Sequence, residues 1–110
     1  MLSLRLQSVA NLIHGPRHAD IGSDHGLLPL ALASRLDLVI AVEKHSGPLE
    51  RLRQALKDCP AQVRAGDGLG PLAPGEVDSL SICGMGALNI GKILSAYPER
   101  LPGHLILQPM

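Results

Sequence analysis

The sequence contains an unbroken apolar run, LVIAVE at residues 38–43, that ends in an acidic residue. A run this short, without polar alternation, is typical of a strand buried on both faces of a parallel sheet. Further short strands are predicted at residues 18–21, 61–65, 79–83 and 104–108, and helices at residues 3–14, 27–36, 46–58 and 88–97. Strands that alternate with helices connect through right-handed crossovers. The sequence therefore predicts an α/β fold with a doubly wound, mostly parallel sheet of about five strands and an N-terminal helix.

Composition indicates a small domain with an aliphatic core. The chain has 110 residues, 45% of them apolar, and a single tyrosine is its only Phe, Trp or Tyr residue. Ten basic and ten acidic residues cancel, so bulk electrostatics predict no polyanionic partner. We expect residues 1–110 to form one domain.

Neither the N-terminal stretch nor the cysteines indicate export. Polar residues interrupt MLSLRLQSVANLI at residues 1–13, so it is predicted to be neither a signal peptide nor a membrane-spanning helix. Cys59 and Cys83 form no CxxC pair, and we interpret them as reduced thiols. The histidines at positions 14, 18, 45 and 104 share no metal-ligand spacing, so no metal site is predicted. These features favour a cytoplasmic protein without a membrane partner.

Acidic residues close three successive predicted strands. Asp20, Glu43 and Asp67 each follow a strand-like segment and lie just over twenty residues apart. In an open α/β sheet, ligands bind beyond the carboxyl ends of the strands. We therefore expect the three acids to gather at one crevice, together with the GMG turn at residues 84–86.

The ADIGSDHG segment at residues 19–26 separates the classes of cofactor. A dinucleotide site requires G-x-G-x-x-G at a helix start, whereas this turn has only Gly22 and Gly26, flanked by Asp20 and Asp24. Each carboxylate beside a pyrophosphate would cost about 1–4 kcal/mol at a surface-like dielectric constant. A P-loop is excluded because no Gly-Lys-Ser/Thr occurs. S-adenosylmethionine carries an ammonium, a sulfonium and no phosphate, so the acids predict this cofactor.

Each acid has a predicted role in cofactor binding and a structural alternative. Asp20 or Asp24 would receive the methionine end, directly or through water. Glu43 would accept hydrogen bonds from both ribose hydroxyls. Asp67 would accept a hydrogen bond from the adenine amino group. The alternatives are a helix cap for Asp20 or Asp24, a solvated acid for Glu43 and a simple turn residue for Asp67.

Five stretches of the sequence resemble the bacterial tRNA (adenine-22-N1)-methyltransferase family of the TrmK type. LSLRLQSVANLI at residues 2–13 is similar to a family helix that reads L-x-x-R-L-x-x-[IV]-A. ADIGSDHGLLP at residues 19–29 is similar to the family pattern A-D-I-G-[ST]-D-H-[AG]-x-L-P. VRAGDGL at residues 63–69, PGEVDSLSICGMG at residues 74–86 and LILQP at residues 105–109 complete a resemblance that spans nearly the whole chain.

The resemblance implies a Rossmann-like class I methyltransferase with strand order 3-2-1-4-5 that moves a methyl group from S-adenosylmethionine to N1 of an adenine in tRNA. We expect Asp24 to be the catalytic residue. It would accept a hydrogen bond from the exocyclic amine of the target adenine or stabilise the cationic product. The expected cofactor-binding residues are Asp20, Gly22, Ser23, Asp24, His25, Gly26, Glu43, Lys44, Asp67, Gly68, Leu69, Gly84, Met85 and Gly86. For His25, a hydrogen-bonded histidine at a helix start is the alternative.

The sequence departs from the family at Met110, where the family has an asparagine after the Gln-Pro pair. The family continues into further strands and a helical extension that helps to hold tRNA, so we expect this chain to be the N-terminal part of a longer protein. A fragment that only binds cofactor or only folds, a methyltransferase acting on a small molecule or a protein, and a nucleotide-dependent reductase are alternatives. The edge of the last strand would be open to self-association.

Overall fold

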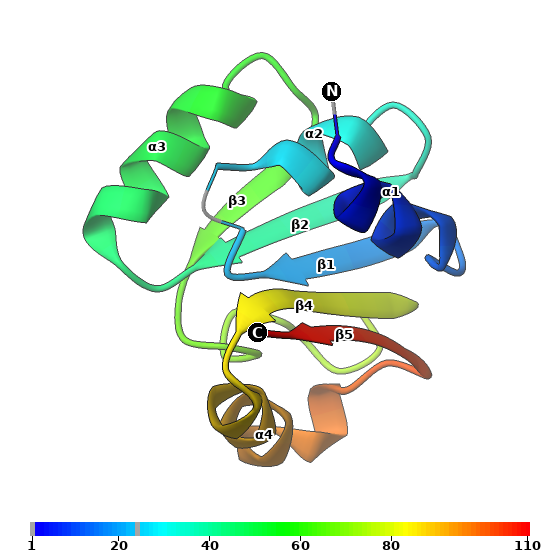
Figure 1. Ribbon diagram of the computed structural model, residues 1–110, viewed down its shortest axis with the longest axis vertical. Helices are drawn as coiled ribbons and strands as arrows, with labels where there is room; N and C mark the ends of the chain where they lie inside the picture. Colours follow the sequence, from blue (N-terminus) through cyan, green and yellow to red (C-terminus); the bar gives the residue numbers. More distant parts are fainter. Residues whose placement is uncertain (1, 24) are drawn as a thin grey trace.

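The computed structural model describes residues 2–23 and 25–110, which form one five-stranded parallel sheet between layers of helices (Figure 1). The strands are β1 (Arg17–Ile21), β2 (Leu38–Glu43), β3 (Gln62–Ala65), β4 (Ser79–Met85) and β5 (His104–Pro109). The helices are α1 (Leu4–Asn11), α2 (Leu27–Leu32), α3 (Ser46–Leu56), α4 (Ala87–Ala96) and the short 3-10 helix η1 (Pro98–Arg100). The sheet order β3-β2-β1-β4-β5 confirms the predicted doubly wound α/β fold.

The predicted strands agree with the structure to within two residues at each end, but two predicted helices are too long. Helix α1 ends at Asn11, and α2 ends at Leu32. Beyond both ends the backbone closes tighter turns, as in the bonds from Leu12 N to Val9 O and from Arg35 N to Leu32 O, each 3.0 Å. Such i to i−3 bonds satisfy the last carbonyls of a helix without extending it.

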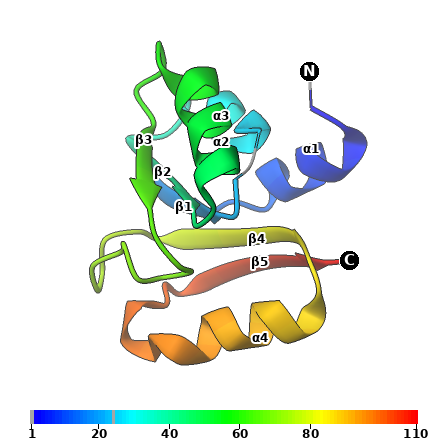
Figure 2. The same cartoon turned by 90° about the vertical axis from the view of Figure 1, so that its left-hand side faces the viewer.

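Different helices cover the two faces of the sheet: α4 lies on one side, and α1, α2 and α3 lie on the other (Figure 2). On the α4 face lies an aliphatic cluster that contains Ala19, Ile21, Ile40, Val42, Leu80, Ile82 and Ile90. On the opposite face, α1 and α2 pack against Val39 and Ile106, and α3 packs against Ala41. Central strands buried on both faces explain why LVIAVE is apolar at successive positions.

Strands and helices do not alternate throughout. The connection from β3 to β4, residues 66–78, contains no helix, although the structure describes each of its residues. Leu69, Leu72 and Val77 of this connection are at most 5% exposed and belong to the aliphatic cluster on the α4 face. The loop itself therefore covers part of the sheet that a crossover helix covers elsewhere.

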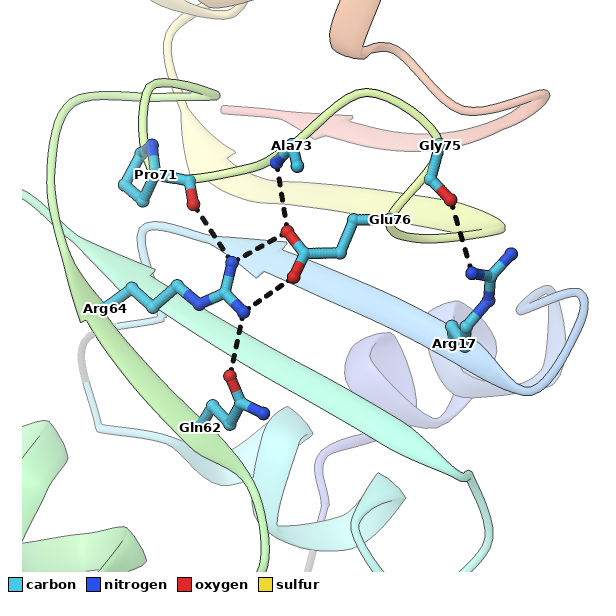
Figure 3. A network of polar contacts seen from close by, with 7 residues as sticks. All are labelled: Arg17, Gln62, Arg64, Pro71, Ala73, Gly75 and Glu76. Carbon is cyan, nitrogen blue, oxygen red and sulfur yellow. Dashed lines mark hydrogen bonds and ion pairs between the residues drawn. The ribbon is translucent and has the colours of Figure 1, made fainter.

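Arg64 of β3 holds this loop in place (Figure 3). Its Nη1 and Nη2 atoms donate to the two carboxylate oxygens of Glu76, each at 2.7 Å. Nη1 also donates to the carbonyl of Pro71 at 3.0 Å, and the Ala73 N–H donates to Glu76 Oε1 at 3.0 Å. The hydrogen bonds from the Arg64 guanidinium lower the pKa of Glu76 to about 2.

Replacement of Glu76 by glutamine is expected to destabilise the protein by about 1–2 kcal/mol at pH 7, after allowance for solvent screening of the partly exposed pair. The folded-state pKa of Glu76 lies below its unfolded value. The contribution is therefore fully present above about pH 4.5 and is lost as pH falls toward 2. Urea unfolding at several pH values measures the difference between the two proteins, with the exposed Glu50→Gln as the control. A difference that stays constant from pH 7 to pH 2 would contradict the assignment.

Candidate functional site

The carboxyl ends of the central strands are joined into one edge by backbone hydrogen bonds. Gly22 N and Ser23 N, in the turn after β1, both donate to the carbonyl of Val42 near the end of β2, at 2.8 and 3.2 Å. Gly66 N, just after β3, donates to the carbonyl of Glu43 at 3.1 Å. The turns that carry the predicted site residues are therefore held side by side, as the strand order requires.

Asp20 is the buried acid of this edge, with only 5% of its surface exposed. Ser81 of β4 donates to Asp20 Oδ1 at 2.7 Å, and Ser23 donates to Oδ2 at 2.8 Å. Burial raises the pKa of Asp20 to about 6, and the two serine hydrogen bonds partly oppose that rise. Asp20 thus remains mostly ionised at pH 7 inside a poorly solvated site.

The alternative role for Asp20, a helix cap, is wrong. Helix α2 begins after Gly26, which has φ = 72° and provides no side-chain cap. The Asp20 carboxylate instead accepts hydrogen bonds from one hydroxyl of β4 and from one hydroxyl of its own turn. The other acid of this turn, Asp24, lies outside the described residues, so its predicted catalytic role stays a prediction.

Glu43 is also buried, at 7% exposure, which excludes the alternative of a solvated acid. Its Oε1 accepts hydrogen bonds from the backbone N–H groups of Lys44 and His45, at 3.1 and 3.3 Å. The backbone that follows β2 therefore turns back toward the Glu43 side chain, and its N–H groups orient the carboxylate.

Asp67 differs from the other two acids because its side chain is 75% exposed. The Lys44 ammonium lies 3.6 Å from its Oδ2 atom. Gly70 N donates to the Asp67 carbonyl at 3.0 Å, so Asp67 opens a tight turn in which Gly68 has φ = 58°. Asp67 is thus both a turn residue and a carboxylate at the rim of the site.

The larger of two neighbouring cavities, about 550 Å³, lies beside the ends of β1, β2 and β3. The predicted site residues that line it are Gly22, Glu43, Lys44, Asp67, Gly68, Leu69 and Met85. Helix α4 completes its wall with Asn89, Lys92, Ile93 and Ala96, followed by Tyr97. This wall was not predicted from the sequence, although spacings of three and four residues place those four helix positions on one face.

The smaller cavity, about 180 Å³, lies on the α1 side of the same turn. The predicted residues Asp20, Gly22, Ser23 and His25 line it. The lining residues not predicted from the sequence are Arg5, Leu6, Leu27, Leu28 and Cys83. Gly22 lines both cavities, so they adjoin at the turn after β1.

Three predicted glycines, Gly26, Gly84 and Gly86, line neither cavity. Gly84 has φ = 75° in the irregular end of β4, and Gly86 precedes the first residue of α4. Both flank Met85, whose methyl group would overlap a Cβ atom placed on Gly22. The glycines of the GMG segment therefore shape the chain around Met85.

Cys83 is partly buried in the smaller cavity and packs against the cluster beneath α1 and α2. Burial raises the pKa of its thiol to about 11, so Cys83 is neutral at pH 7 and unsuited to nucleophilic attack. Both cysteines are free thiols, as predicted.

Within residues 2–23 and 25–110, no group of three or more His, Cys, Asp or Glu side chains could hold a metal ion. No helix in the same part of the chain is long and apolar enough to span a bilayer.

Comparison with known proteins shows to which family the chain belongs. A family model described as a methyltransferase domain matches residues 2–110. The chain belongs to this methyltransferase domain family. A Bacillus subtilis (strain 168) protein named tRNA (adenine(22)-N(1))-methyltransferase is 44% identical over 117 residues, which cover 98% of this chain and 49% of that protein.

Solved structures agree with the sequence match. The B. subtilis M1A22 tRNA methyltransferase TrmK has a TM-score of 0.90 and 39% identity, covering 99% of this chain and 50% of that one. A Streptococcus pneumoniae protein solved in complex with S-adenosyl-L-methionine has a TM-score of 0.88 and 34% identity, covering 99% of this chain and 56% of that one. The chain spans about half the length of the relatives it matches.

Replacement of Asp20 by asparagine is expected to stabilise the methyltransferase domain at pH 7 by about 1–3 kcal/mol, since the amide removes a buried charge and keeps a hydrogen-bonding shape. The folded-state pKa of about 6 lies above the unfolded value, so the burial penalty is present above pH 6 and disappears as pH falls toward 4. Urea unfolding of both proteins between pH 4 and 8 measures this, with the exposed Asp58→Asn as the control. A variant less stable than the parent at pH 7 would show that the serine hydrogen bonds outweigh the burial penalty.

Proposed function

We propose that this chain binds S-adenosyl-L-methionine across the turn at Gly22 and acts in the methylation of N1 of an adenine in tRNA. The observation that carries the proposal is the buried, doubly hydrogen-bonded carboxylate of Asp20 at the end of β1. A second buried carboxylate, Glu43, lies at the end of the neighbouring strand. Two negative charges at this edge favour a cationic ligand and oppose a pyrophosphate.

The two cavities match the two halves of the proposed cofactor. The larger cavity, about 550 Å³, has a volume typical of small-molecule sites and would hold the adenosine portion. Glu43 would accept from the ribose hydroxyls, and Asp67 and Leu69 at the β3 turn would contact the adenine. The smaller cavity would receive the methionine end beside Asp20 and Ser23, with Gly22 allowing close approach between them.

The relatives support this cofactor and this acceptor. A Streptococcus pneumoniae structure contains S-adenosyl-L-methionine, and a TrmK structure from M. capricolum, 26% identical, contains S-adenosyl-homocysteine. The B. subtilis relatives are named as methyltransferases that act on tRNA adenine. Because this chain spans about half of those proteins, we propose that it provides the cofactor-binding domain, residues 1–110, and that tRNA binds with the help of further chain.

The proposed chemistry needs little from the protein beyond positioning. When bound, S-adenosylmethionine supplies an electrophilic methyl group on its sulfonium. Adenine N1 already carries an in-plane lone pair, so no strong base is required; orientation and exclusion of water are the main contributions. In this proposal Asp24 accepts a hydrogen bond from the exocyclic amine and places N1, and the neutral Cys83 thiol takes no covalent part.

Titration calorimetry tests the cofactor. S-adenosylmethionine should bind, whereas NAD should show no measurable heat at the same concentrations. Glu43→Gln is expected to weaken S-adenosylmethionine binding about 10-fold to 100-fold, because a charged acceptor is replaced by a neutral amide. Glu50→Gln, on an exposed position of α3, should leave binding unchanged. Binding of NAD without binding of S-adenosylmethionine would refute the proposal.

Asp24→Ala tests the methyl-transfer step separately from cofactor binding. In the whole protein this change should abolish methylation of a tRNA transcript while S-adenosylmethionine affinity changes by less than about tenfold. Radioactive methyl transfer measures the first quantity and calorimetry the second. Undiminished methylation would remove Asp24 from the mechanism.

We further propose that the protein acts in the cytoplasm, where its tRNA substrate would be found, and that β5 offers a surface for self-association. In the described part of the chain, residues 2–23 and 25–110, β5 lies at one edge of the sheet next to β4. Leu105 and Leu107 on it are each 39% exposed. An edge strand with exposed leucines favours pairing with another strand, and sedimentation velocity would detect pairing with a second copy of the chain.

A further inference from the structure

A row of polar side chains lies buried between β1 and β4, on the sheet face that packs against α1 and α2. His18, Ser79 and Ser81 are fully buried, and Asp20 is 5% exposed. The parallel register pairs His18 with Ser79 and Asp20 with Ser81, so the row follows the two strands toward the proposed cofactor site. On the next strand, the corresponding positions of the same face are occupied by Val39 and Ala41.

The hydrogen bonds of this row can run in only one direction while Asp20 is ionised. A carboxylate accepts and cannot donate, so the single Ser81 proton is directed to Asp20 Oδ1 at 2.7 Å. Ser81 Oγ, 2.8 Å from His18 Nε2, must then accept from that nitrogen. His18 therefore carries its proton on Nε2, and Nδ1, 2.6 Å from Ser79 Oγ, accepts from the Ser79 hydroxyl.

The imidazole remains neutral throughout the physiological range. Burial lowers the pKa of His18 to about 4, so His18 adds no charge to the row at pH 7. Its Nε2–H supplies the donor that orients the Ser81 hydroxyl, and hydrogen bonds that donate in series strengthen one another. A hydrophobic side chain at residue 18 would fill the same space and leave Ser81 without this donor.

We infer that His18 is a positioning residue for the proposed cofactor site: its Nε2–H anchors the Ser81 hydroxyl, which holds the Asp20 carboxylate ready for the cationic methionine end of S-adenosylmethionine. The inference rests on the proposed function and adds to it a residue two positions before Asp20 that lines neither cavity.

Other titratable groups also face Asp20 or the row. They are Glu43 at the end of β2, Arg5 of α1, His25 of the turn before α2, Cys83 of β4, and His104, which pairs with Ser79 in the β5 register. Glu43 opposes ionisation of Asp20 through charge repulsion. His18 differs from them because its ring donates to the Ser81 hydroxyl, which contacts Asp20 Oδ1.

Histidine NMR tests the direction of the hydrogen bonds along this row in the parent protein, without any ligand. Long-range nitrogen–proton correlation spectra should show the Nε2–H tautomer for His18 at pH 7. An Nδ1–H tautomer would overturn the inference, whatever the outcome of cofactor binding. This measurement requires no variant, so it stands even if a substitution prevents folding.

Variants then test the consequence for Asp20. His18→Leu should raise the titration midpoint of the Asp20 carboxyl carbon by about 0.5–1 pH unit, and should move the pH profile of S-adenosylmethionine binding upward by the same amount. His18→Gln, whose amide can donate from the Nε2 position, should restore the parent profile. Ser79→Ala is the matched control, because it removes a buried partner of His18 but leaves the Nε2–H bond to Ser81.

The outcomes separate this inference from the proposed function. An unchanged Asp20 midpoint in His18→Leu, or an equal shift in Ser79→Ala, would overturn the positioning role. A shifted Asp20 midpoint in His18→Leu, together with a parent protein that fails to bind S-adenosylmethionine at any pH, would support the effect of His18 on Asp20. The same result would refute the proposed cofactor.

Discussion

The burial of one carboxylate organises this domain. Asp20 is almost inaccessible to solvent, yet both of its oxygens accept hydroxyl hydrogens, one from β4 and one from its own turn. An ionised carboxylate without such partners would be far too costly at the end of a central strand. The need to satisfy it explains why Ser81 and His18 lie on the same sheet face as the apolar Val39, Ala41 and Ile106.

The two faces of the sheet differ in the side chains that they bury. The α4 face is aliphatic and continuous, closed by a loop that Arg64 and Glu76 hold against β3. The opposite face combines apolar contacts to α1, α2 and α3 with the polar row that ends at Asp20. Both faces thus contribute buried apolar clusters, and the side of α1, α2 and α3 also contains the charge that the proposed cofactor would neutralise. A domain that spends stability on a buried charge in this way is typical of binding sites.

Much of this arrangement was predictable from the order of residues along the chain. Continuous apolar runs predicted parallel strands, and acids at successive strand ends predicted a shared edge, because parallel strands end on the same side of a sheet. The α4 wall at Asn89 and Lys92 and the contribution of Arg5 were missed, because neither has a local signal that sets it apart from a solvated helix face. The helix-free connection between β3 and β4 was equally hidden, since a loop that buries Leu69 and Val77 looks irregular in sequence.

The sequence by itself determined the strand periodicity, the aliphatic core and the signs of the charges at the strand ends, since these depend on residue type and local spacing. Only the tertiary structure decided which acids became buried: Asp20 and Glu43 did, whereas Asp67 remains at the rim. It also decided that His18, an unremarkable residue in sequence, lies within hydrogen-bonding distance of two serines about sixty positions away. Burial and hydrogen-bond direction depend on neighbours that folding brings together, and sequence spacing carries no record of them.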